Sequence, residues 1–178
     1  MSFPFGKPNL SRPRKTRAAV LTVSDRCAAG KRPDLGGPVV TEAALRAGWT
    51  VVDSAVVADE RAAVSGRLRS WCDGAKAPDL ILTTGGTGLS PRDVTPEATR
   101  DVLDREIPGI AERMRREGER FTPMAALSRA LAGSRANTLI VNLPGSPKGA
   151  RESLAAVAEL IEHALHVLKG GDHKNDPS

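Results

Sequence analysis

The chain has 178 residues, of which 40% are hydrophobic and 26% charged, a composition typical of one globular domain. No apolar run approaches the roughly 18–20 residues that cross a bilayer, and no secretory signal is visible, so we expect a cytoplasmic protein without a membrane partner. The two cysteines, Cys27 and Cys72, form no CxxC pair, which argues against a disulfide framework or a structural zinc site.

The formal net charge of +5 is concentrated at the amino terminus. Residues 1–17 carry five basic residues and no acidic one, so the rest of the chain is neutral overall. With 3% aromatic residues and no tyrosine, the chain also lacks the stacking platforms that bind single-stranded nucleic acid. We therefore expect no nucleic-acid partner, and we interpret residues 1–16 as a basic flexible leader.

After the leader, short apolar β-type runs alternate with helical patterns. Strands are expected at residues 17–24, 50–57, 79–84 and 138–143. Helices are expected at residues 38–47, 60–72, 95–103, 108–120 and 147–168, with Thr95 as the N-cap of the third. This alternation predicts a single three-layer α/β domain over residues 17–169, with a mostly parallel sheet and helices on both faces. Residues 170–178 form a polar tail.

Three of the expected strands end in residues that can bind ligands. Ser24 and Asp25 follow the first strand, the run 84–88 follows the third, and the run 142–148 follows the last. Because ligands collect at the carboxyl ends of parallel strands, we expect these three segments to converge.

The run Thr84-Gly85-Gly86-Thr87-Gly88 is the strongest candidate for a phosphate site. Glycines reach positive φ and let backbone amides approach an anion, although a plain tight turn is the alternative. Neither the Walker pattern nor the dinucleotide pattern fits the chain, so another class of nucleotide site is expected. Replacing Gly86 by Val should weaken nucleotide binding at least tenfold, about 1.4 kcal/mol, with a far smaller effect on thermal stability.

Charged residues near these strand ends are the candidates for catalysis. Arg92 can neutralise phosphate charge, and Asp93 can hold Mg²⁺ or position a nucleophile, unless the two form only a surface ion pair or a cap. Asp25 has the same alternative, a carboxylate that caps a loop. Ser146 and Lys148 begin the last helix and could form a second anion site or an ordinary helix cap.

Taken together, the motifs resemble the molybdopterin adenylyltransferases of molybdenum-cofactor synthesis, the MogA/MoaB-like family that also includes the G domain of gephyrin. The similarity covers about residues 17–169 and rests on five segments, Thr-Val-Ser-Asp-Arg (22–26), Leu-Thr-Thr-Gly-Gly-Thr-Gly (82–88), Pro-Arg-Asp-Val-Thr-Pro-Glu-Ala-Thr (91–99), Leu-Ser-Arg (127–129) and Asn-Leu-Pro-Gly-Ser-Pro-Lys-Gly (142–149).

The resemblance implies an enzyme that transfers the adenylyl group of ATP to the terminal phosphate of molybdopterin, releasing pyrophosphate, with Mg²⁺ bound with ATP. Asp93 and Asp25 would be catalytic, and Asp93 would also hold the metal. The binding residues for nucleotide and pterin would be Ser24, Thr84, Gly85, Gly86, Thr87, Gly88, Arg92, Ser128, Arg129, Pro144, Gly145, Ser146 and Lys148. Family members are typically homotrimers, which carries over by analogy.

Two alternatives stay open at this stage. One is a nucleotide pyrophosphatase on the same fold, as in the competence-damage family, but that family tends to carry Gly-Pro-Thr and paired aspartates after the Gly-rich loop. The other is a molybdopterin-binding scaffold without catalysis, a role that gephyrin has in part.

Overall fold

The structure is a computed structural model that describes residues 14–171, so the expected leader and tail lie outside the described residues except at 14–16 and 170–171. Its elements in chain order are β1 (Arg17–Val23), α1 (Asp25–Ala28), α2 (Gly36–Arg46), β2 (Thr50–Val57), α3 (Arg61–Cys72), β3 (Leu80–Thr84), α4 (Thr95–Arg100), β4 (Arg105–Glu106), α5 (Pro108–Gly118), the 3₁₀ helix η1 (Pro123–Leu127), β5 (Ala132–Arg135), β6 (Thr138–Leu143) and α6 (Pro147–Leu168).

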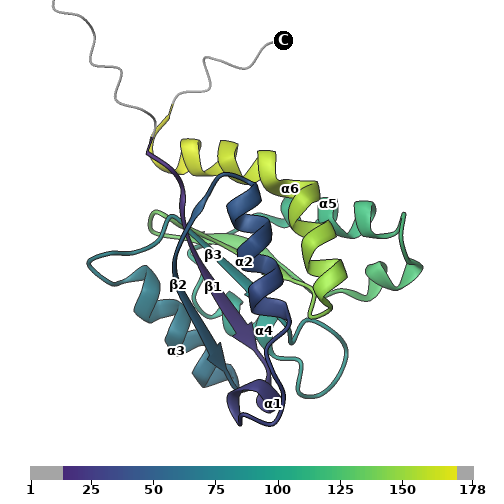
Figure 1. Ribbon diagram of the computed structural model, residues 1–178. Helices are drawn as coiled ribbons and strands as arrows, with labels where there is room; N and C mark the ends of the chain where they lie inside the picture. Colours follow the sequence, from purple (N-terminus) through teal and green to yellow (C-terminus); the bar gives the residue numbers. More distant parts are fainter. Residues whose placement is uncertain (1–13, 172–178) are drawn as a thin grey trace, which may run out of the picture.

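The strands form one six-stranded sheet in the order β2-β1-β3-β6-β5-β4 (Figure 1). The four strands β2, β1, β3 and β6 run parallel, which confirms the expected mostly parallel sheet. The other two are antiparallel to their neighbours and close one edge of the sheet. These two short strands, β5 and β4, were not expected.

Side chains of the central strands alternate between two apolar cores, one on each face of the sheet. On one face, Val20, Leu82 and Val141 pack under helices α2, α5 and α6. On the other face, Leu21 and Ile81 pack under α3 and α4. Both faces are therefore covered by helices, which explains why these strands read as continuous apolar runs (Figure 1).

Two polar side chains close to the site have structural roles. Thr95 does not cap α4 as expected: the N-cap is Val94, and the Thr95 hydroxyl donates instead to the carbonyl of Gly85 at 2.8 Å. The fully buried Asn142 donates its amide to the hydroxyls of Thr83 and Thr99, each at 3.0 Å. The bond of Thr95 to Gly85 and the bond of Asn142 to Thr99 fix helix α4 against the carboxyl ends of β3 and β6.

The described chain begins and ends at the same side of the domain, where the parallel strands start (Figure 1). Asp79, just before β3, accepts a hydrogen bond from the backbone amide of Arg17 at 2.8 Å and forms an ion pair with Lys169 at 2.9 Å. One carboxylate thus holds the start of β1 and the end of α6. Among residues 14–171, no helix is long and apolar enough to cross a membrane.

Candidate active site

The three strand ends that the sequence marked as candidates lie together in the structure. Strands β1, β3 and β6 are neighbours in the sheet, so their carboxyl ends meet at one edge. Thr84, at the end of β3, donates its hydroxyl to the carbonyl of Pro144 after β6 at 2.8 Å. A Cβ atom on Gly85 would overlap the carbonyl oxygen of Val23 at the end of β1. The Gly-rich loop is therefore packed tightly between the other two segments.

The backbone of this loop requires glycine at two successive positions. Gly85 has a φ of +100° and Gly86 a φ of +65°, conformations that cost a residue with a Cβ atom about 1–2 kcal/mol. Gly145 also lies close, because a Cβ atom there would be 3.3 Å from the Cα atom of Gly85. The glycines thus serve both the backbone conformation and the close approach of two loops.

The carbonyl groups of Gly85–Gly88 all accept hydrogen bonds from elsewhere in the protein. Thr95 donates its hydroxyl and its amide to the first two, at 2.8 and 3.0 Å. Arg129 donates its amide and its Nε to the last two, at 2.9 and 2.7 Å. Within the described part of the chain, the amides of the same residues donate no hydrogen bond. The loop therefore offers a run of unbonded amides, the arrangement that binds phosphate.

Asp25 and Arg92 meet beside the loop, as their expected roles at one site require. The Arg92 guanidinium donates to both carboxylate oxygens of Asp25, at distances of 2.7 to 3.0 Å. This hydrogen-bonded pair lowers the pKa of Asp25 and raises that of Arg92. The ion pair expected as the alternative was that of Arg92 with Asp93, whereas in the structure Arg92 pairs with Asp25 at the edge of the site.

Asp59 is a site residue that the sequence reasoning missed. Its carboxylate accepts from the amide of Asp25 at 2.7 Å, and its own amide donates to the carboxylate of Asp25 at 2.9 Å. Burial raises the pKa of Asp59, and the negative charges of Asp25 and Asp93 act in the same direction. The sequence held part of this signal, because Asp59 follows the carboxyl end of the expected strand 50–57, but only the strand order, with β2 beside β1, brings it to the site.

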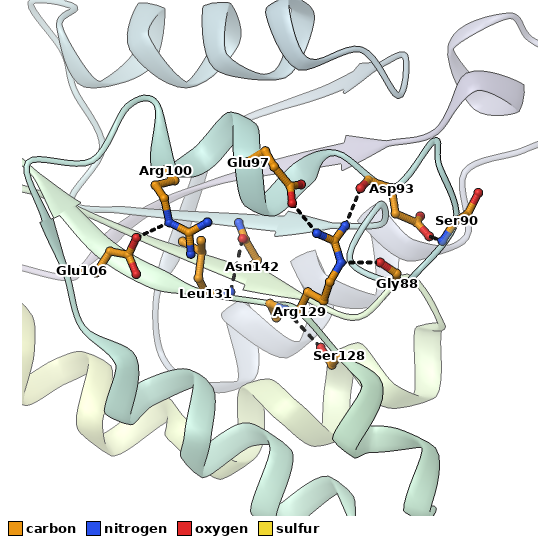
Figure 2. Close-up of polar contacts among 11 residues, drawn as sticks. Gly88, Ser90, Asp93, Glu97, Arg100, Glu106, Ser128, Arg129, Leu131 and Asn142 are labelled. Atoms are coloured by element: carbon orange, nitrogen blue, oxygen red, sulfur yellow. Dashed lines mark hydrogen bonds and ion pairs between the residues drawn. The ribbon is translucent and has the colours of Figure 1, made fainter.

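Asp93 is half-buried at the base of the loop that follows the glycines. Its Oδ2 accepts from the amide of Ser90 at 2.8 Å, a contact drawn in Figure 2. The same oxygen would lie 2.9 Å from a Cβ atom on Gly88, which places it directly against the Gly-rich loop. One of its oxygens thus shapes the turn while the carboxylate stays beside the unbonded amides.

Two cavities flank the Gly-rich loop. The larger, of about 270 Å³, touches Thr87 and Gly88 and is walled by Ser128 and by apolar side chains of α5 and η1 such as Met114 and Met124. The smaller, of about 210 Å³, has a more polar wall. Between them they contain most of the expected binding residues: Pro144 and Ser146 border the larger cavity, and Ser24, Thr84, Gly85 and Gly145 border the smaller.

Three of the expected binding residues, Ser146, Lys148 and Arg129, make contacts within the protein. Ser146 caps α6 by accepting from the amide of Gly149 at 3.2 Å, which is the ordinary helix cap kept open above. Lys148 is exposed and lies 3.9 Å from Glu152. Arg129 contacts three groups of the protein through its guanidinium.

The carboxylate oxygens at the site suit a magnesium ion that is bound mainly by substrate phosphates. Among residues 14–171, no group of three or more His, Cys, Asp or Glu side chains is arranged to hold a metal ion. Mg²⁺, however, is commonly held by one or two carboxylates together with substrate phosphates. Asp59 and Asp93 offer carboxylate oxygens next to the run of unbonded amides, and the pKa of Asp59 is raised by burial and, to a smaller extent, by the negative charges of Asp25 and Asp93. The side chains present therefore fit such an ion.

Residues 19–163 match the family model described as "Probable molybdopterin binding domain". The chain belongs to this family. Among curated members, it is 40% identical to the molybdopterin adenylyltransferase of Helicobacter pylori (strain J99) over 153 residues, which are 85% of this chain and 86% of that protein. It is also 40% identical to the molybdopterin adenylyltransferase of Escherichia coli K12, over 80% of this chain and 74% of that protein.

The family also includes larger proteins. The chain is 42% identical to the molybdenum cofactor synthesis protein cinnamon of Drosophila melanogaster, covering 84% of this chain but 25% of that protein. Among solved structures, the molybdopterin biosynthesis enzyme MoaB of Thermus thermophilus superposes with a TM-score of 0.82 at 53% identity, covering 87% of this chain and 97% of that one. The expected resemblance and fold are thereby confirmed.

Proposed function

We propose that this protein is a molybdopterin adenylyltransferase: it transfers the adenylyl group of ATP to the terminal phosphate of molybdopterin and releases pyrophosphate. The observation that carries the proposal is the Gly-rich loop, in which all four carbonyls of Gly85–Gly88 are held by the protein and all four amides donate no hydrogen bond within the described residues. The names of the relatives support the choice of substrates.

In this proposal the amides bind the phosphates of ATP, and the larger cavity receives the pterin against its apolar wall. An attacking phosphate oxygen of molybdopterin reaches the α-phosphorus, and pyrophosphate leaves from the opposite side. No nucleophilic side chain is needed, because the substrate supplies the attacking oxygen. The protein contributes position and charge, which is typical of phosphoryl-type transfer.

The charged side chains divide between binding and catalysis. Arg92 exchanges its bond with Asp25 for phosphate oxygens, where its positive charge offsets the charge that develops on pyrophosphate. Asp93 and Asp59 would hold Mg²⁺ together with the ATP phosphates, and Asp25 would orient the substrates. When bound, this ion neutralises phosphate charge and aligns the reacting groups. In keeping with the resemblance, we further propose that the enzyme works as a homotrimer in the cytoplasm.

The alternatives make different predictions for the same assay. Purified protein is incubated with ATP, Mg²⁺ and molybdopterin, and both pyrophosphate and adenylyl-molybdopterin are measured. The proposal requires both products and requires no pyrophosphate when molybdopterin is omitted. Binding without product would indicate a scaffold. Hydrolysis of nucleotide without molybdopterin would indicate a pyrophosphatase.

A further inference from the structure

The side chain of Arg129 joins three parts of the site (Figure 2). Its Nε donates to the carbonyl of Gly88 at 2.7 Å, and one terminal nitrogen donates to the carbonyl of Asp93 at 2.5 Å. The other terminal nitrogen bonds a carboxylate oxygen of Glu97 on helix α4. All three nitrogens of the guanidinium are therefore engaged with the protein itself.

This arrangement clamps both ends of the turn between Gly88 and Asp93. The tip of the turn, at residues 89–92, is exposed, whereas its two ends bond to the same guanidinium. The backbone amide of Arg129 also holds the carbonyl of Thr87 at 2.9 Å. A single residue thus holds three carbonyl groups, those of Thr87, Gly88 and Asp93, around the unbonded amides and the candidate catalytic carboxylate.

The carboxylate of Glu97 also depends on its contact with Arg129. One of its carboxylate oxygens bonds Arg129, and within the described residues the other is buried without a hydrogen-bond partner. The negative charge of Glu97 is therefore balanced chiefly by the guanidinium. Helix α4, which carries Glu97, is in turn fixed to the sheet through Thr99 and the buried Asn142.

Arg92 provides the contrast. Its side chain is 58% exposed and, among residues 14–171, bonds only the carboxylate of Asp25, so it can turn toward a phosphate at the cost of one exposed ion pair. Arg129 is 34% exposed, and turning it toward a phosphate would leave two backbone carbonyls and a partly buried carboxylate without their donor. The two arginines therefore suit different tasks.

We propose that Arg129 and Glu97 form a positioning pair, which holds the run of unbonded amides and Asp93 in the geometry for adenylyl transfer without touching substrate. This inference rests on the proposed function and refines one part of it, because the resemblance had placed Arg129 among the residues that bind substrate. The two roles of Arg129 predict different effects of a Glu97 substitution. A positioning role predicts weaker ATP binding, and a substrate-binding role does not.

The test compares Glu97→Gln and Arg129→Lys with the wild-type enzyme. If the pair positions the loop, Glu97→Gln lowers kcat at least tenfold and weakens ATP binding about threefold to fivefold, because it loosens the clamp. Arg129→Lys behaves similarly, since one ammonium group cannot serve three acceptors in different directions. If Arg129 instead binds phosphate, Glu97→Gln leaves ATP affinity unchanged or tightens it, and Arg129→Lys keeps most of the activity. That outcome overturns the proposal.

A matched control comes from the same helix. Asp101, at the carboxyl end of α4, forms a two-pronged ion pair with Arg61 at 2.6 Å for both bonds, and it makes no contact with the Gly-rich loop. Asp101→Asn should keep kcat within twofold. If Asp101→Asn lowered kcat as much as Glu97→Gln does, breaking any ion pair on α4 would have this effect, and the specific role of Glu97 would be refuted. Hydrogen exchange, which does not depend on catalysis, should be faster at the hydrogen-bonded amides of Ser90 and Asp93 in Glu97→Gln but not in Asp101→Asn.

The two proposals can fail separately. If wild-type protein binds ATP by calorimetry but forms no adenylyl-molybdopterin, the proposed function is wrong, and ATP affinity and hydrogen exchange still decide the role of the pair. If the wild type is active and Glu97→Gln matches it in kcat, affinity and exchange, the positioning pair alone is wrong. Each variant is checked by its thermal midpoint, so that loss of folding is not counted as loss of positioning.

Discussion

Replacing Gly86 by alanine should destabilise the fold as well as weaken nucleotide binding. Gly86 has a φ of +65°, and a Cβ atom there would overlap the hydroxyl of Thr95 and lie 3.3 Å from a carboxylate oxygen of Asp59. The sequence alone suggested that a side chain at this surface loop would harm only the bound phosphate. The contact with Thr95, a residue with 0% exposure, changes that expectation.

The size of the effect follows from two contributions. An alanine in the left-handed region costs about 1–2 kcal/mol. Moving the buried Thr95 hydroxyl breaks its bond to Gly85, which costs a further 1–3 kcal/mol or so. We expect a total of about 3 kcal/mol, or a decrease of about 9 °C in Tm at roughly 3 °C per kcal/mol for a chain of this length. ATP affinity should fall at least tenfold, about 1.4 kcal/mol.

Gly30 supplies a matched control for the backbone contribution. Its φ is +66°, and a Cβ atom added there meets nothing within 4 Å. Gly30→Ala should therefore cost only the conformational part, about 1.5 kcal/mol, or about 4–5 °C in Tm. Differential scanning calorimetry gives both shifts, and isothermal titration with ATP gives the affinity.

A double variant tests the reasoning directly. In a Thr95→Ala background the obstructing hydroxyl is gone, so adding Gly86→Ala should again cost only about 1.5 kcal/mol. Strictly additive losses, or equal losses for Gly86→Ala and Gly30→Ala, would show that contact with Thr95 plays no part. Unchanged ATP affinity in a folded Gly86→Ala protein would show that the loop is only a turn.

Three further predictions concern charge and the chain start. Asp59→Asn should raise Tm at pH 7 while lowering kcat at least tenfold, about 1.4 kcal/mol. Because folding raises the pKa of Asp59, the charge of Asp59 opposes folding. The gain in Tm should therefore disappear as the pH falls and the wild-type carboxyl becomes protonated. Asp79→Asn should lower Tm most near pH 7. Burial raises the pKa of Asp79, but its bonds to Arg17 and Lys169 outweigh burial and lower the pKa below 3.8, so the wild type loses the stabilisation by this carboxylate as the pH falls through and below that value. A difference in Tm between variant and wild type that persists at pH 2 would contradict this prediction. Deletion of residues 1–16, which the sequence analysis interpreted as a flexible leader, should lower Tm because it removes the bond from the Thr16 hydroxyl to Glu162 at 3.0 Å. Deletion of residues 1–13 is the control.

The sequence predicted the elements whose signals are local. Strands β2 and β6 and helix α6 have the expected bounds, because continuous β-branched runs and a Ser-Pro helix start are encoded where they occur. Strand β5 was missed because Ala132-Gly133-Ser134-Arg135 carries no β-branched or large apolar residue. A Cβ atom on Gly133 would overlap the carbonyl of Arg105 on β4, so this strand is defined by close packing that no local pattern announces.

The same distinction applies to the site. Ser24, the Gly-rich loop and the loop after β6 could be grouped from sequence, because each follows a recognisable strand. Asp59 could not be grouped with them without the strand order, which puts β2 beside β1. The engagement of Arg129 with Glu97 joins residues 32 positions apart through tertiary packing, and only the structure shows which oxygen each nitrogen meets.

The contacts of Asp79 hold the start of the first strand and the end of the last helix together, at the side of the domain opposite the Gly-rich loop. The parallel strands start at this side, and their carboxyl ends, with the Gly-rich loop, lie at the other. The two ends of the described chain therefore lie on the side of the domain away from the phosphate site. This placement suits a unit that is joined to further polypeptide, as in the relative of which the matching part is 25% of the length.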